Sequence, residues 1–297
     1  MEQSFTKRRK WILYTLYGIL LTPVFLFLLF PSDTLVDYIQ ANAHSKYPGL
    51  LVNLKKASLS LPFGLKLEGI ECEIQGFPEQ IVLTSNEIVI RPRIWSLLSK
   101  SPEYRFICQA YNGNVTGRIN LQENGGETVF SLSTEFDNIH IDDKSPLPTS
   151  IKGYISGILE GAITFNGADL FDSKSTGEAS LTLSDGAIKF PEPILNINTV
   201  DFNEVLFKAE LKNRNLNISD TSFKGKNFNG EASGVMMVRS PMNKSRLNFR
   251  GSIEPTNVFI QDSSNNDDAL LLLKNVFQNR KTFTISGTIE KPNFRLN

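Results

Sequence analysis

This sequence of 297 residues contains few histidines and cysteines and has no net charge. It has two histidines, two cysteines, and 31 basic residues balanced by 31 acidic ones, so the formal net charge is zero. A metal centre needs several converging nitrogen, sulfur or carboxylate ligands, which two histidines and two cysteines rarely supply. Nucleic-acid binding favours an excess of basic residues. The composition therefore predicts neither a metal site nor a nucleic-acid partner.

Sequence motifs for catalysis and cofactor binding are also missing. The chain has no P-loop, no dinucleotide-binding fingerprint and no G-x-S-x-G elbow. His140 lies close to Asp142 and Asp143, but this pattern is more typical of a polar turn than of a catalytic or metal site. We therefore predict no catalytic residues, no metal ligands and no cofactor, and we do not expect an enzyme.

One long hydrophobic run, residues 11–30, is present. It contains twenty residues without a charge, and a helix of that length spans roughly 30 Å, the thickness of a bilayer core. Basic residues 7–10 precede it and Asp33 follows it, so the positive-inside rule places the N-terminus in the cytoplasm. A cleavable signal peptide is the alternative, but its apolar core would be shorter and would end at small residues. A buried core helix would need a polar face, which this run lacks.

These features predict four segments. Residues 1–10 form a cytoplasmic tail, 11–30 a single transmembrane helix, 31–48 a juxtamembrane helix, and 49–297 a β domain beyond the membrane. Ser32 is suited to cap the second helix, which would run over residues 33–46 and end at the Tyr47-Pro48-Gly49 sequence. A proline-containing stretch at 142–150 is a candidate boundary inside the β domain, and residues 269–277 a candidate final helix.

From residue 50 onward the apolar residues alternate with period two, which indicates strands. The phase slips near Lys55 and again at Gly69, as at a β-bulge or bend. Spaced glycines at 113/117, 153/157 and 230/234 suggest a long, curved sheet, although ordinary turn glycines would look the same. The sequence predicts a mainly β fold: a long, strongly twisted antiparallel sheet with a few short helices, arranged as an open groove or a half-open sandwich.

The alternation is one-sided, so one face of the sheet is dry and must be covered. A second sheet would cover it in a sandwich, and a lipid acyl chain would cover it in a groove. The sequence does not decide between these two possibilities. The candidate residues for the apolar lining are Leu181, Leu183, Leu247, Phe249, Phe283 and Ile285.

Cys72 and Cys108 both lie in strand-like patterns. Beyond the membrane the compartment would be oxidising, which would allow a disulfide between them. Free cysteine in an apolar strand behaves equally well as a small hydrophobic residue. Sequence alone does not supply the geometry that would decide between these states.

Several segments together resemble the type II secretion system protein N (GspN) family, which belongs with the AsmA-like periplasmic proteins. Besides the anchor, they are PFGLKLEGI (62–70), IVIRPRIWSLL (88–98), YNGNVTG (111–117), GEASLTLSDGAI (177–188) and TISGTIEKPNF (284–294). The resemblance implies a bacterial inner-membrane anchor and a periplasmic β groove. It implies an accessory role in type II protein secretion, with secretion-system or other envelope proteins as partners. The alternative it implies is lipid binding or lipid transfer between the two membranes, with membrane lipids as partners.

Overall fold

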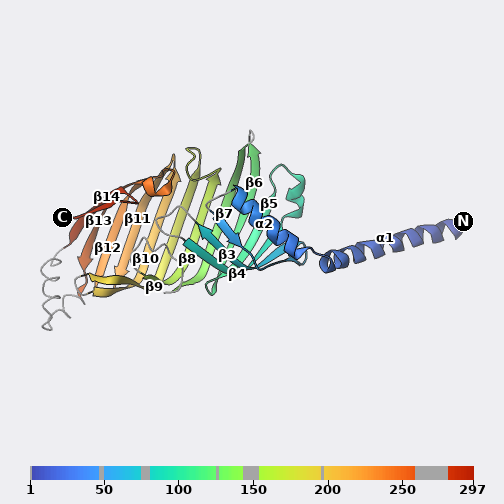
Figure 1. The fold of residues 1–297 in the computed structure, drawn as a ribbon, viewed down its shortest axis with the longest axis horizontal. Coiled ribbons are helices and arrows are strands. Elements are labelled where there is room, and N and C mark those ends of the chain that lie inside the picture. The colour runs from blue at the N-terminus through green and yellow to red at the C-terminus, as the bar shows by residue number, and fades with distance from the viewer. Residues whose placement is uncertain are drawn as a thin grey trace.

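The chain forms one long antiparallel sheet with two α-helices at its N-terminal end (Figure 1). The computed structural model describes residues 2–46, 50–74, 81–124, 127–142, 154–194, 197–257 and 280–297. The two chain ends lie at opposite ends of the long axis, with α1 extending away from the sheet (Figure 1). The predicted mainly β fold with a long antiparallel sheet is confirmed.

The elements follow one another in a simple order, with two short 3₁₀ helices between strands. They are α1 (Glu2–Leu28), α2 (Ser32–Lys46), β1 (Leu50–Asn53), β2 (Lys56–Ser60), β3 (Gly64–Ile74), β4 (Ile81–Pro92), η1 (Ile94–Leu98), β5 (Glu103–Ala110), β6 (Gly113–Asn124), β7 (Glu127–Ile141), β8 (Tyr154–Gly167), β9 (Thr176–Ile194), β10 (Ile197–Lys212), β11 (Asn215–Gly225), β12 (Phe228–Met237), η2 (Met242–Lys244), β13 (Arg246–Pro255), β14 (Lys281–Thr288) and β15 (Pro292–Leu296).

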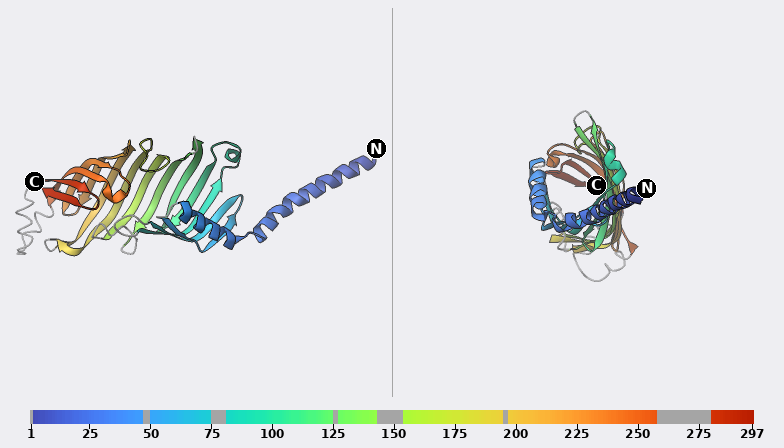
Figure 2. Two further views of the ribbon diagram at one scale, coloured as in Figure 1. Left: turned by 45° about the horizontal axis from the view of Figure 1, so that its top comes forward. Right: turned by 90° about the vertical axis from the view of Figure 1, so that its right-hand side faces the viewer.

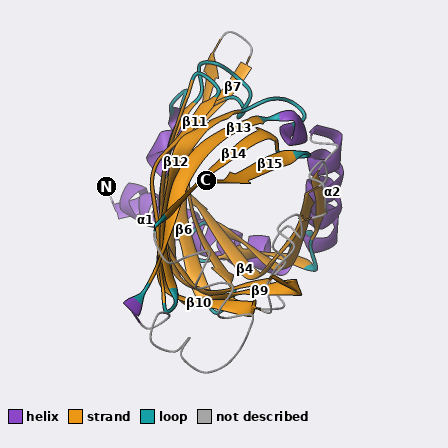
Figure 3. Ribbon diagram, turned by 90° about the vertical axis from the view of Figure 1, so that its left-hand side faces the viewer, coloured by secondary structure: helices purple, strands orange, loops and turns teal. Residues whose placement is uncertain are grey.

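The strand order is that of a continuous meander. β1 and β2 both pair with β3, and from β3 to β15 each strand pairs with the next one in the chain. All the described strands belong to this one sheet, so the two-sheet sandwich considered from the sequence is not formed by the described residues. β7 and β8 pair with each other across the candidate boundary at 142–150, of which only residue 142 is described. The sheet curls about its long axis in the end views (Figures 2 and 3).

Helix α1 begins at Glu2, earlier than the predicted membrane span, and includes all four basic residues at positions 7–10. Its described apolar side chains are largely exposed, among them Trp11 at 75% and Leu16 at 64%. No helix within the described part of the chain is long and apolar enough to cross a membrane. The transmembrane anchor therefore stays a prediction.

Helix α2 confirms the predicted second helix and packs on the first strands of the sheet. Its residues Leu35, Val36 and Ile39 contact a buried cluster made by Leu54, Ala57, Leu67 and Ile70. Ser32, which was expected to precede the helix as its cap, is the first residue of α2, and its hydroxyl accepts a hydrogen bond from the Ala57 backbone N–H at 3.3 Å. This bond attaches the start of the helix to β2.

Irregular backbone appears where the alternation slips. Gly69 has φ +62°, and the Lys55 backbone N–H bonds the Glu68 carbonyl beside it, so the apolar side chains before and after the slip reach the same cluster. The sequence Asp185-Gly186 favours a tight turn, yet it lies inside β9, where Asp185 has φ +49° and the strand continues through a local distortion. The candidate helix at 269–277 lies outside the described residues.

Candidate functional site

One row of paired residues crosses the whole sheet on its apolar face. Directly paired residues of an antiparallel sheet point to the same side, so the register of each strand pair defines this row. We call it the central row: Ala57, Leu67, Ile88, Cys108, Val115, Phe136, Gly161, Leu181, Phe207, Thr221, Ala232, Gly251, Phe283 and Leu296. It contains no charged residue, and Thr221 carries its only hydroxyl.

Exposure increases along the central row from the α2 end to the C-terminal end. Ala57 and Leu67 are buried beneath α2, at 1% and 7% exposed. The residues from Ile88 to Phe283 are all half-buried. Leu296 is 42% exposed, and its neighbour Phe294 on the same face is 58% exposed. The apolar face is therefore covered by a helix at one end and open to solvent at the other.

All six residues predicted to line the apolar face lie on it. Leu181 belongs to the central row, and Leu183 is the next residue on the same side of β9. On β13 and β14, Phe249 pairs with Ile285, and both flank the Gly251–Phe283 pair. Leu247 follows on the same side of β13. Each of the six is half-buried, as expected where neighbouring side chains lie beside it and the described strands place no second sheet above it.

Phenylalanine and glycine pair repeatedly across this face. The pairs are Phe106–Gly117, Phe130–Gly167, Phe136–Gly161, Phe165–Gly177, Phe202–Gly186, Phe223–Gly230, Phe249–Gly234 and Phe283–Gly251. In several of them the ring fills the space that a glycine side chain would need, as Phe106 does over Gly117. A ring lying over a glycine covers backbone that would otherwise be exposed and allows the sheet to coil strongly. Of the spaced glycines noticed in the sequence, Gly117, Gly230 and Gly234 belong to this pattern, and their aromatic partners become visible only with the register.

The two cysteines are free thiols on the same face. Cys72 pairs with Leu83 and Cys108 pairs with Ile88, so the whole width of β4 separates them. Two strand spacings are about 9–10 Å, which exceeds the Cα separation that a disulfide bridges. The disulfide considered from the sequence is not formed in this structure. The Cys108 thiol lies 3.2 Å from the Ser85 hydroxyl oxygen.

We expect both thiols to react slowly with maleimide in the folded protein. Burial raises the pKa of Cys72, and burial likewise raises the pKa of Cys108, so less thiolate is present near pH 8 than for a free cysteine. The pKa of each thiol is higher in the folded protein than in the unfolded protein. Burial of the neutral thiols therefore favours folding most below the unfolded-state pKa, and this contribution is lost as pH rises through the folded-state pKa. Labelling rates across pH 7–10, with and without denaturant, measure this. Equal rates in the two states would contradict it.

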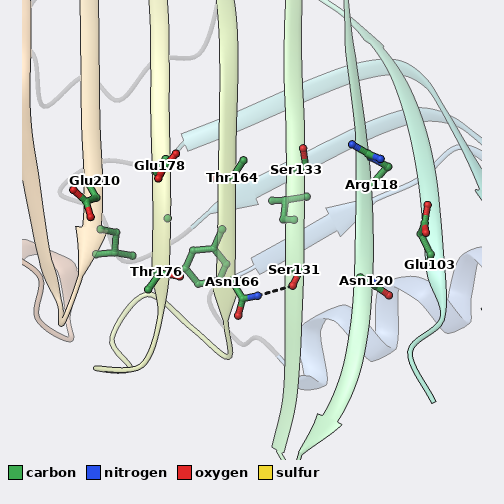
Figure 4. A pocket seen from close by; sticks show the side chains of 14 residues that line it. Glu103, Arg118, Asn120, Ser131, Ser133, Thr164, Asn166, Thr176, Glu178 and Glu210 are labelled. Carbon is green, nitrogen blue, oxygen red and sulfur yellow. Dashed lines mark hydrogen bonds between the residues drawn. The ribbon is translucent and has the colours of Figure 1, made fainter. Parts of the chain in front are cut away.

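The opposite face of the sheet is polar. A hollow of about 470 Å³ lies over β5 to β10, with Glu103, Arg118, Glu178 and Glu210 pointing into it (Figure 4). Glu103 accepts a hydrogen bond from Arg93 at 3.0 Å, and this guanidinium holds the pKa of Glu103 below its usual value. These exposed side chains are typical of the solvated face of a sheet.

No protein-family model, no curated protein and no solved structure matches this chain. The likeness to the GspN family therefore stays an expectation drawn from the sequence segments that carry it.

Proposed function

We propose that this protein binds the alkyl chains of membrane lipids on its apolar face and passes them along the central row. The observation that carries the proposal is the uncharged row itself, which continues through fourteen paired strands from Ala57 to Leu296. At about 4.8 Å per strand it is roughly 60 Å long. Each methylene group that leaves water contributes about 0.8 kcal/mol, so such a surface suits a long alkyl chain.

The start of the row supports a membrane as the source of the lipid. Phe30, the last residue of the hydrophobic run, packs against the same buried cluster as α2 and the first residues of the row. The exposed apolar side chains of α1 would be stable in a bilayer. We propose a single-pass anchor over residues 11–30 in a bacterial inner membrane, with the N-terminus in the cytoplasm and the sheet in the periplasm.

A charge in the middle of the central row tests the proposal. Leu181→Asp puts a carboxylate among uncharged neighbours, where a bound alkyl chain would desolvate it, and this costs several kcal/mol. We expect at least about a ten-fold loss of bound lipid, measured by native mass spectrometry of the full-length protein released from detergent. Ser180→Asp, which introduces the same charge on the exposed polar face of the same strand, is the matched control and should bind as the unmodified protein does.

Two results would contradict the proposal. One is an unmodified protein that never carries lipid when purified from membranes. The other is an equal loss of lipid in Leu181→Asp and Ser180→Asp, because it would assign the effect to added charge rather than to the apolar face. Circular dichroism of both variants checks that the sheet is intact.

A second candidate function is an accessory role in type II protein secretion. The outer edge of β15 is not paired with any described strand, and such an edge can accept a strand from another protein. Cross-linking in intact cells through a photoreactive residue at Asn293 would test it. Recovery of secretion-system or other envelope proteins would support this role, and recovery of lipid alone would oppose it.

A further inference from the structure

Six exposed cations gather along one margin of the C-terminal half of the sheet. They come from the ends of β10 and β13 and from the connections β10–β11, β12–β13 and β14–β15, and we call this margin the distal rim: Lys212, Arg214, Arg239, Lys244, Arg246 and Lys291. Glu178, Glu210 and Glu290 lie at the same margin, and the neighbouring β8–β9 connection carries Asp169, Asp172 and Lys174. Within the three connections from β10 to β15, four cations face one acidic residue, Glu290, so positive charge dominates there in a chain whose total charge is zero.

Backbone hydrogen bonds hold the connections of the distal rim together. The Val238 N–H donates to the Arg214 carbonyl at 2.8 Å, and the Ile289 N–H donates to the Ser245 carbonyl at 3.1 Å. Ser245 is fully buried, and its hydroxyl accepts the Arg239 N–H at 3.0 Å. Three separate turns are thus fixed side by side, which holds their charged residues at one margin.

The distal-rim cations differ from other cations of the same region in having no acidic partner within the described ranges. On the polar face, Lys208 pairs with Asp220 at 3.4 Å and Lys224 with Glu204 at 2.6 Å. Arg280 pairs with Glu231 at 3.2 Å. None of the six cations of the distal rim forms such an ion pair with a described residue. They remain available to an anionic group from outside the protein.

The connections of the distal rim, which carry Arg214, Arg239, Lys244 and Lys291, border the last apolar row, whereas the strand ends Lys212 and Arg246 lie on the polar side of β10 and β13 by their register. The paired residues Leu211, Leu216, Met236 and Leu247 form the last apolar row before the turns. An alkyl chain lying on this row has its polar end at the rim. We infer that the distal rim binds the phosphate of an anionic lipid headgroup while the alkyl chain lies on the neighbouring apolar face. The inference rests on the proposed function and adds the class of lipid to it.

Removal of the rim charges tests the inference. The triple variant Arg214→Gln/Arg239→Gln/Lys244→Gln keeps long polar side chains and removes three charges from the connections beside the apolar row. Lys208→Gln/Lys224→Gln/Arg280→Gln removes the same number of charges from the same half of the sheet, but from cations that already have partners. The full-length proteins are incubated with vesicles containing equal parts of phosphatidylcholine and phosphatidylglycerol, and bound lipid is identified by native mass spectrometry.

We expect the unmodified protein and the control to bind more phosphatidylglycerol than phosphatidylcholine. In the rim variant the ratio of bound phosphatidylglycerol to bound phosphatidylcholine should fall at least about ten-fold, while phosphatidylcholine is still bound. Added salt should weaken the preference, because exposed charges are screened. An unchanged preference in the rim variant, or an equal loss in the control, overturns the inference. So does complete removal of the preference by inorganic phosphate, which would indicate a free-phosphate site. If no variant binds either lipid, the proposed function itself fails.

Discussion

Gly251→Ala is expected to destabilise the sheet by about 2–4 kcal/mol. A methyl group at this position would overlap the ring of Phe283 on β14 and the carbonyl oxygen of Glu231 on β12. Neither neighbour can move away easily, because one is a backbone carbonyl and the other is a half-buried ring stacked on Phe294. Overpacking of this kind forces side chains from their rotamers and shifts the backbone, and at this position it would reduce the local coiling of the sheet.

Gly230→Ala is the matched control for Gly251→Ala. It lies on the adjacent strand and the same face, and it also pairs with a phenylalanine, Phe223. A methyl group there would lie 3.3 Å from the Ser252 carbonyl oxygen and 3.8 Å from the Phe223 side chain, which requires only a small adjustment. We expect a change within about 1 kcal/mol. Thermal unfolding of the full-length proteins in one detergent, followed by circular dichroism at the β-sheet minimum, measures both. Equal melting temperatures for the two variants would contradict the role assigned to the Phe283–Gly251 pair.

The strands of the sheet could be predicted because the alternation of apolar and polar residues is visible within each strand's own sequence. Period-two alternation identified most strands, and the slip at Gly69 identified a real irregularity. Helix α2 was predictable for the same reason, since the proline and glycine at residues 48 and 49 end a helical pattern. Asp185-Gly186 shows why turns are harder to predict: a turn and a positive-φ distortion inside a strand use the same residue types.

The apolar face was only partly predictable, because it depends on register. Six of its residues were identified from alternation within single strands, but alternation does not state which strands are neighbours. Phe136 and Gly161 are 25 positions apart, and only the pairing of β7 with β8 brings them together. The number of sheets was undecided for the same reason: each one-sided strand fits a sandwich as well as a single curled sheet. The distal rim is likewise a product of three connections that meet in space.

Leu67→Asp is expected to prevent stable docking of α2 and to destabilise the protein by at least about 4 kcal/mol. Leu67 is 7% exposed and belongs to the cluster that Leu35, Val36 and Ile39 of α2 cover. The substitution removes a buried aliphatic side chain and introduces a carboxylate without a partner. Burial would raise the pKa of this new carboxyl, so the destabilisation should be smaller in acid and grow as pH rises through that raised pKa.

The control for Leu67→Asp lies on the same strand pairing and the same face. Leu83 is 44% exposed, so a carboxylate at that position stays hydrated, and Leu83→Asp should cost no more than about 1.5 kcal/mol. Limited proteolysis reads out the docking of α2 directly, because a helix released from the sheet is cut between residues 32 and 46 well before the strands are. If Leu67→Asp left both the cleavage rate of α2 and the melting temperature unchanged, the packing of α2 on the apolar face would not contribute to stability. Rapid cleavage of α2 with an intact sheet would instead show that the start of the central row becomes exposed when the helix undocks. In that state a lipid from the membrane could reach Ala57.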